Sequence, residues 1–135
     1  MTIEKRFTFP KRERLVSRRL IEQLFGGSGS RSVAAYPLRA VWLLTERTSY
    51  DAPVQVLVSV PKKRFHHAVD RNRVKRQVRE AFRRHQQVLC ESVPADRQLL
   101  LAFVWLSDAH CPSHDVESRV ANLLRRIAEK VTALR

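Results

Sequence analysis

The basic segment from Ser59 to Arg84 constrains the fold of this chain more than any other feature. Ten of its residues are Lys or Arg and two, Asp70 and Glu80, are acidic, so it carries +8 (ten minus two) of the net charge of +13. Apolar residues recur within it at helical spacing, which a disordered basic tail would lack. The pattern therefore predicts a folded helix that packs on a core along one side and presents cations to a polyanion along another.

The size and composition of the chain favour one domain with a phosphate-rich partner. A length of 135 residues with 44% hydrophobic residues allows a modest core. The pI near 11.2 favours nucleic acid over an anionic membrane or no anionic partner. We find no apolar run of about 18 residues and no signal-peptide pattern, so we expect a cytoplasmic protein without a membrane partner. In that reducing compartment the two cysteines are expected to be free thiols.

Apolar periodicity and turn signals predict a single α+β domain after a basic, flexible tail at residues 1–12. Helices are predicted at 13–25, at 68–90 and from Ser113, taken as an N-cap, to the C-terminal end. Strands are predicted at 32–35, 38–45, 54–60 and 99–106. The order α-β-β-β-α-β-α indicates a small four-stranded sheet packed by the long basic helix.

A helical projection divides the basic helix into two arcs. The arc expected to pack on the sheet is apolar and contains Val74, Val78, Ala81, Phe82, Val88 and Leu89. The adjacent arc is polar and cationic and contains Asn72, Lys75, Arg76, Arg79 and Arg83. Because exposed ion pairs add little stability and clustered cations repel one another, a partner that neutralises them is the economical explanation. Arg73 and Arg84 lie further round, beside Glu80.

The sequence offers no catalytic or metal site of a protein enzyme. Zinc ligands are present as Cys90, His110, Cys111 and His114, but their spacing matches no zinc motif. A protein nuclease needs clustered carboxylates, whereas the aspartates of this chain are scattered over loops and helix ends. Asp70 is expected to offset the positive end of the basic helix. We therefore predict no catalytic residue and no bound metal in the protein itself.

The residues of the basic segment resemble those of one family. The run from Ala68 to Arg83 looks like the RNR signature of the bacterial ribonuclease P protein subunit, and Val58 to Lys63 resembles the strand of that family that ends in Ser-x-x-Lys-Lys. The resemblance extends over roughly residues 10–130. It implies an RNA-binding α+β domain at 13–135 with the fold of ribosomal protein S5 domain 2, including a left-handed βαβ crossover.

The resemblance also implies partners and roles. Such a protein assembles with a catalytic RNA that removes the 5′ leader of precursor tRNA using Mg²⁺ bound mainly by the RNA, and no obligate protein partner is implied. Catalytic-RNA contacts are expected from Lys62, Lys63, Arg71, Asn72, Arg73 and Arg76. Contacts with the leader, in a cleft between the helix and the sheet face, are expected from Phe25, Tyr36, Arg39, Lys75, Arg79 and Arg83.

The chain departs from the family pattern at two places, and other functions stay open. The loop at Arg64–His67 is one residue longer and lacks a Gly often found there, and Ile21 stands where a second aromatic commonly lines the cleft. The main alternative is a non-enzymatic ribosomal or RNA-chaperone protein. A DNA-binding regulator is a more distant one, because no compact turn precedes the basic helix.

Overall fold

The protein folds around one mixed four-stranded sheet. The computed structural model describes residues 13–47 and 52–134, so the predicted tail at 1–12 lies outside the described residues. The strands are β1 (Arg31–Ala35), β2 (Leu38–Glu46), β3 (Val54–Ser59) and β4 (Arg97–Trp105), in the sheet order β1-β2-β4-β3. Pairing is antiparallel except between β3 and β4, which are parallel. The predicted α+β class and order of elements are confirmed.

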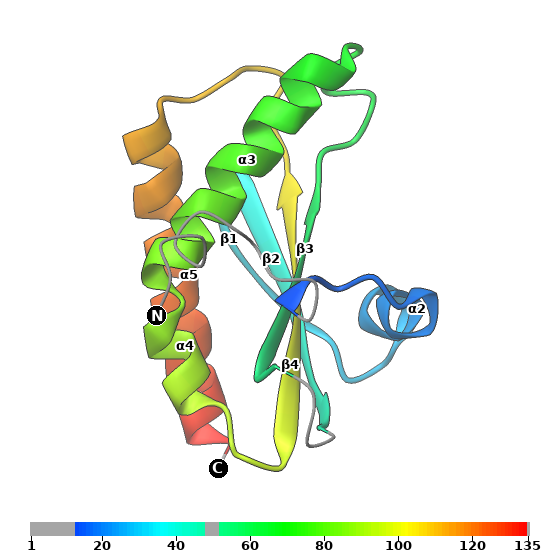
Figure 1. Cartoon of the computed structure of the whole chain (residues 1–135), viewed down its shortest axis with the longest axis vertical. Helices are drawn as coiled ribbons and strands as arrows, with labels where there is room; N and C mark the ends of the chain where they lie inside the picture. The colour runs from blue at the N-terminus through cyan, green and yellow to red at the C-terminus, as the bar shows by residue number, and fades with distance from the viewer. Residues whose placement is uncertain (1–12, 48–51, 135) are drawn as a thin grey trace, which may run out of the picture.

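Helices cover both faces of the sheet (Figure 1). The helix α2 (Arg18–Gly26) lies on one face, and α3 (Ala68–His85), α4 (Gln87–Ser92) and α5 (Ser113–Ala133) lie on the other. The larger core fills the space under α3, α4 and α5 and buries the side chains of Trp42, Phe82, Phe103 and Trp105 completely. A smaller cluster under α2 consists of Leu15, Leu24, Val41, Leu43, Leu100 and Ala102. Because β4 is covered on both faces, its sequence is almost continuously apolar.

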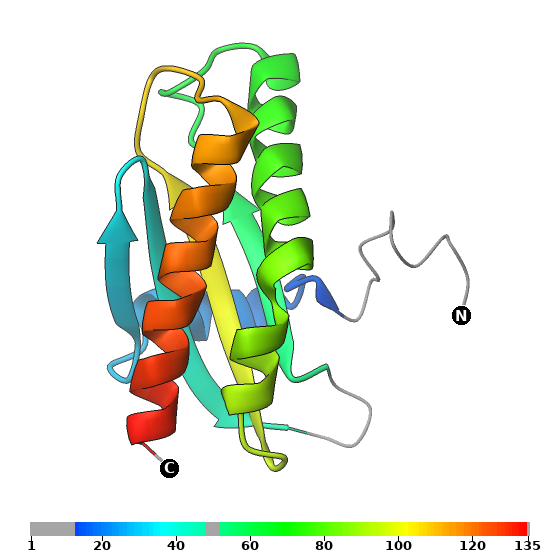
Figure 2. The same ribbon diagram turned by 90° about the vertical axis from the view of Figure 1, so that its left-hand side faces the viewer.

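The connection from β3 through α3 to β4 is left-handed. Seen from the helix side in Figure 2, the two parallel strands run in the same direction with β4 (yellow) to the left of β3 (green), and the helix passes in front of them. General rules favour the opposite hand. The left-handed crossover that the family resemblance implied is therefore present.

Two predicted helices have different bounds in the structure. The first begins at Arg18, not Glu13, with the Ser17 hydroxyl accepting a hydrogen bond from the Leu20 amide (3.4 Å). The preceding Arg14 forms a bridge with Val56 of β3. The long basic helix divides at Gln86 into α3 and α4, which leaves Val88, predicted to be in the core, 46% exposed.

Two predicted helix ends are also different. Pro112, not Ser113, is the N-cap residue of α5, and the Ser113 hydroxyl instead accepts a hydrogen bond from Gln77 Nε2 (3.1 Å). The N-cap of α3 is His67, which makes no side-chain capping bond, while Asp70 lies in the first turn as expected for a favourable interaction with the helix dipole.

Candidate nucleic-acid interface

The N-terminal half of α3 and the loop before it present cations that lack carboxylate partners. Lys62 and Lys63 are exposed in the turn that follows β3, and Arg73 and Arg76 are exposed on the helix. Within the described part of the chain, none of these four side chains forms an ion pair. Asn72, an uncharged donor and acceptor, lies exposed among them. A phosphate backbone that follows the loop and the helix can therefore neutralise the charge of several cations.

Arg71 of the predicted RNA-binding set points back toward the loop before α3. Its guanidinium donates hydrogen bonds to the backbone carbonyls of Phe65 (2.8 Å) and His66 (2.9 Å). The side chain therefore joins the first turn of α3 to the preceding loop. It has donors left over for a ligand, because a guanidinium carries five.

The two sides of α3 face different neighbours. On one side Gln77 donates to the Cys111 carbonyl (3.0 Å) and to Ser113, which joins α3 to the start of α5. On the other side Arg79 lies near Arg14, which pairs with the edge strand β3. Partial burial first, and the charge of Arg14 second, lower the pKa of Arg79. This second side thus brings cations from two elements together at the β3 edge of the sheet.

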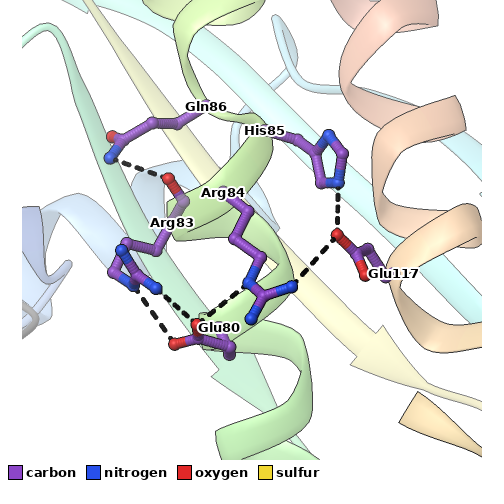
Figure 3. Close-up of polar contacts among 6 residues, drawn as sticks. All are labelled: Glu80, Arg83, Arg84, His85, Gln86 and Glu117. Atoms are coloured by element: carbon purple, nitrogen blue, oxygen red, sulfur yellow. Dashed lines mark hydrogen bonds and ion pairs between the residues drawn. The ribbon is translucent and has the colours of Figure 1, made fainter. Parts of the chain in front are cut away.

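Carboxylates of the protein itself neutralise the cations in the C-terminal half of α3 (Figure 3). Glu80 accepts hydrogen bonds from Arg83 Nε (3.1 Å) and Arg84 Nε (3.2 Å). Glu117 of α5 lies 2.8 Å from His85 Nε2 and 3.8 Å from Arg84. The hydrogen bond from Arg83 lowers the pKa of Glu80 most, and the same contact raises the pKa of Arg83. Of the six expected leader-binding residues, Arg83 is the one that this cluster holds.

The remaining expected leader contacts lie on the sheet and on α2. Arg39 projects from β2 on the α2 face, in a cross-strand row with Ala34, Val104 and Ser59. This row is beyond the apolar cluster under α2, and Arg39 and Ala34 are exposed. Tyr36, in the turn after β1, is 66% exposed, and Phe25, on α2, is 49% exposed.

Lys75 and Arg79 approach this surface from the other side of the sheet. They belong to α3, which packs on the face opposite α2. One route by which a strand of RNA reaches both groups passes around the β3 edge, where Arg14 lies. Arg14 was missed by the sequence prediction, which placed it inside a helix. The residues expected to line the leader cleft therefore come from both faces of the sheet.

The described residues contain no grouped metal ligands. Among residues 13–47 and 52–134, no three His, Cys, Asp or Glu side chains lie close enough together to hold a metal ion. Burial, with help from the negative charges of Glu13 and Glu91, raises the pKa of the Cys90 thiol to about 11, so it is a poor thiolate ligand at neutral pH. Within the same described ranges, no helix has the length and apolar character needed to cross a membrane.

Comparisons with known proteins agree with this geometry. Residues 9–128 match the family described as Ribonuclease P. The ribonuclease P protein component of Porphyromonas gingivalis is 41% identical over 135 residues, covering 97% of this chain and 94% of that protein. The protein component of Nitrosococcus oceani is 39% identical over 85 residues, covering 63% of this chain and 66% of that protein.

Solved structures share the fold. The RNase P protein of Staphylococcus aureus superimposes with a TM-score of 0.65 at 17% identity, over 85% of this chain and 94% of that one. The Thermotoga maritima RNase P protein gives a TM-score of 0.64 at 24% identity, over 84% and 96%. The family match over most of the length disfavours the ribosomal, RNA-chaperone and DNA-binding alternatives. This chain therefore belongs to the ribonuclease P protein family, whose members are subunits of the RNA–protein enzyme that processes the 5′ ends of tRNA.

Proposed function

We propose that this chain binds ribonuclease P RNA through the loop after β3 and the N-terminal half of α3. The residues assigned to this surface are Lys62, Lys63, Arg71, Asn72, Arg73 and Arg76. The observation that carries the assignment is that the exposed cations among them lack carboxylate partners in the described chain, while those at the other end of the same helix have them. Arg71 contributes mainly by holding the loop.

A second surface is proposed for the 5′ leader of precursor tRNA. It follows the exposed row on the sheet and the β3 edge, and it uses Phe25, Tyr36, Arg39, Lys75 and Arg79, with Arg83 as a minor member. Exposed aromatic rings suit unpaired bases, since stacking contributes about 1–3 kcal/mol per base. Cations on the helix suit the backbone of the same strand.

Catalysis is assigned to the RNA. The described residues bring no carboxylate cluster to either surface, and Mg²⁺ at the cleavage site is proposed to be held mainly by RNA phosphates. The protein's own part is to bind, to orient the leader and to reduce repulsion between the RNA molecules. The cytoplasm, where precursor tRNA is processed, is the proposed compartment.

Reconstitution tests this function directly. The chain is mixed with a bacterial ribonuclease P RNA and a precursor tRNA at low Mg²⁺, and leader removal is compared with that by RNA alone. Cleavage should increase on addition of the protein, because added cations offset phosphate repulsion when Mg²⁺ is scarce. A variant with Arg18→Ala serves as a matched control, since that exposed arginine of α2 pairs with Glu22 on its own helix. Unchanged cleavage with the wild-type protein would contradict the proposal.

A further inference from the structure

Two loops meet at the start of the basic helix. The loop between β3 and α3 contains Phe65, whose ring stacks on His110 of the loop between β4 and α5, with centroids 4.5 Å apart and planes inclined by 18°. Beside this stack, the Arg64 guanidinium lies 3.2 Å from the Asp108 carboxylate. Two contacts of different kinds therefore join loops that are more than forty residues apart in the chain.

His110 also reaches the first turn of α3. Its Nε2 lies 3.1 Å from Oδ1 of Asp70, and the next residue, Arg71, donates two hydrogen bonds back to the carbonyls of Phe65 and His66. These contacts join the β3–α3 loop to the His110 ring, the ring to the first turn of α3, and that turn back to the β3–α3 loop. We call this group the loop brace: Phe65, Asp70, Arg71 and His110.

We infer that His110 is a positioning residue for RNA binding, which acts by holding the loop and the helix start in one arrangement. The inference rests on the proposed function. Lys62 and Lys63 precede Phe65 by two or three residues, and Asn72 and Arg73 directly follow Arg71. The loop brace thus lies between the two groups of exposed donors assigned to the RNA. It fixes the spacing between them before the RNA arrives.

The chemistry of the loop explains why a brace is useful. Lysine and arginine side chains lose much freedom when they bind, and a mobile loop adds to that loss. Here a turn closed by the Arg64 amide on the Pro61 carbonyl (3.0 Å) orders the lysines, and the stack on His110 fixes the turn against the loop between β4 and α5. His110 also contacts the half-buried carboxylate of Asp70. Without this contact, the carboxylate would repel phosphate in the middle of the proposed RNA-binding surface.

The test uses the full-length chain and ribonuclease P RNA alone, with affinity measured over a range of salt concentrations. His110→Ala should weaken binding about five- to thirtyfold, the loss expected when two or three long side chains must be ordered on binding. The slope of log affinity against log salt should stay unchanged, because no phosphate contact is removed. Lys62→Ala with Lys63→Ala should instead reduce that slope by about 1.5.

Two further variants keep the inference falsifiable. His110→Phe retains the stack, loses the bond to Asp70 and removes the enclosed Nδ1, which has no hydrogen-bond partner among the described residues. The fold is therefore expected to be kept while affinity falls by an intermediate factor. In the background without Lys62 and Lys63, His110→Ala should cost about threefold or less, since the side chains it positions are gone. His114→Ala is the control, because that histidine is 84% exposed and its ion-pair contact is with the adjacent Asp115.

The outcomes separate the two claims. Wild-type affinity in His110→Ala, a reduced salt slope, or an equal loss in the background without the two lysines would each overturn the positioning role alone. Failure of the wild-type chain to bind the RNA would overturn the proposed function, and the inference with it. Thermal melting of each variant shows that the measured chains are folded at the assay temperature.

Discussion

The two halves of α3 have the same kind of side chain in different surroundings. In the N-terminal half, the exposed Arg73 and Arg76 have no ion-pair partner among the described residues. In the C-terminal half, Arg83 and Arg84 both contact Glu80, and Glu117 of α5 contacts the end of the helix. A count of basic residues would treat both halves as equal. The positions of the two glutamates distinguish a surface open to phosphate from one already neutralised.

The difference has two origins, the position of Glu80 on α3 itself and the way in which α5 approaches α3. The helices are joined by Gln77 near the start of α5 and by Glu117 one turn further along. Among the described residues, the ion pairs that basic side chains of α3 make with another element are those of Arg84 and His85 with Glu117, in its C-terminal half. Such exposed pairs add at most about 1 kcal/mol of stability each, so their main effect is on the charge that a ligand meets.

The largest loss of RNA affinity is expected when cations are removed from the N-terminal half of α3. Arg73→Ala with Arg76→Ala should weaken binding of ribonuclease P RNA about 10- to 100-fold and reduce the salt slope by about 1.5, since two charge-assisted contacts are lost. The matched pair, Arg83→Ala with Arg84→Ala, should cost about threefold or less. Salt-dependent filter binding measures both. Equal losses from the two pairs would remove the distinction between the halves.

A smaller and more selective effect is expected at the β3 edge. Lys75→Ala or Arg79→Ala in the assembled enzyme should weaken binding of precursor tRNA about three- to tenfold and leave mature tRNA within about twofold, because only the precursor carries a leader. Arg39→Ala should behave in the same way if the strand passes around the sheet edge. Parallel losses for precursor and mature tRNA would show that these side chains contact the tRNA body or the catalytic RNA.

Removing the carboxylate that neutralises the C-terminal half of α3 should have the opposite effect and increase the affinity for RNA. Glu80→Gln frees Arg83 and Arg84 from their shared carboxylate and should raise affinity for ribonuclease P RNA about two- to fivefold at low salt, with a steeper salt slope. Glu22→Gln on α2 is a control that makes the same change of charge away from the helix. An increase of the same size in both variants would point to net charge and not to position.

The smallest effect concerns stability. Because the pKa of Glu80 is lowered in the folded state, its contribution is present above the ordinary value of 4.5 and is lost as the pH falls through the folded pKa. Glu80→Gln should therefore lower the free energy of unfolding by at most about 1 kcal/mol at pH 7, and the difference should vanish in acid. Urea unfolding at pH 7 and below pH 4 measures it. A difference that grows in acid would contradict this assignment.

Local patterns predicted most of the fold. Alternation and apolar runs placed all four strands within about two residues, and helical periodicity identified Val74, Val78, Ala81 and Phe82 as buried. The division at Gln86 could not be predicted, because the residue keeps helical dihedral angles and neither Gly nor Pro marks the position. The start of the first helix was missed because pairing of Arg14 with Val56 is a contact with a distant strand, although Ser17 was an available N-cap signal.

The sequence predicted which types of residue form the site better than it predicted the contacts that each residue makes. Sequence placed the cations on one long helix, where the i,i+3 and i,i+4 spacing of Glu80 from Arg83 and Arg84 is visible, but the contacts of Arg84 and His85 with Glu117 depend on how α5 packs. The bonds of Arg71 to the loop before α3 depend on the conformation of that loop, and the stack of Phe65 on His110 depends on two loops that meet only after folding. Composition and spacing carry no information on such contacts.

The central position of β4 has a consequence for how the chain is made. β4 pairs with both β2 and β3, yet it is the last strand to leave the ribosome. Until Arg97–Trp105 is synthesised, the β1–β2 hairpin and β3 have no common neighbour, and their apolar faces are exposed to water during translation. Nascent chains truncated before β4 should therefore need protection from aggregation, while chains that include it can close the sheet in one step.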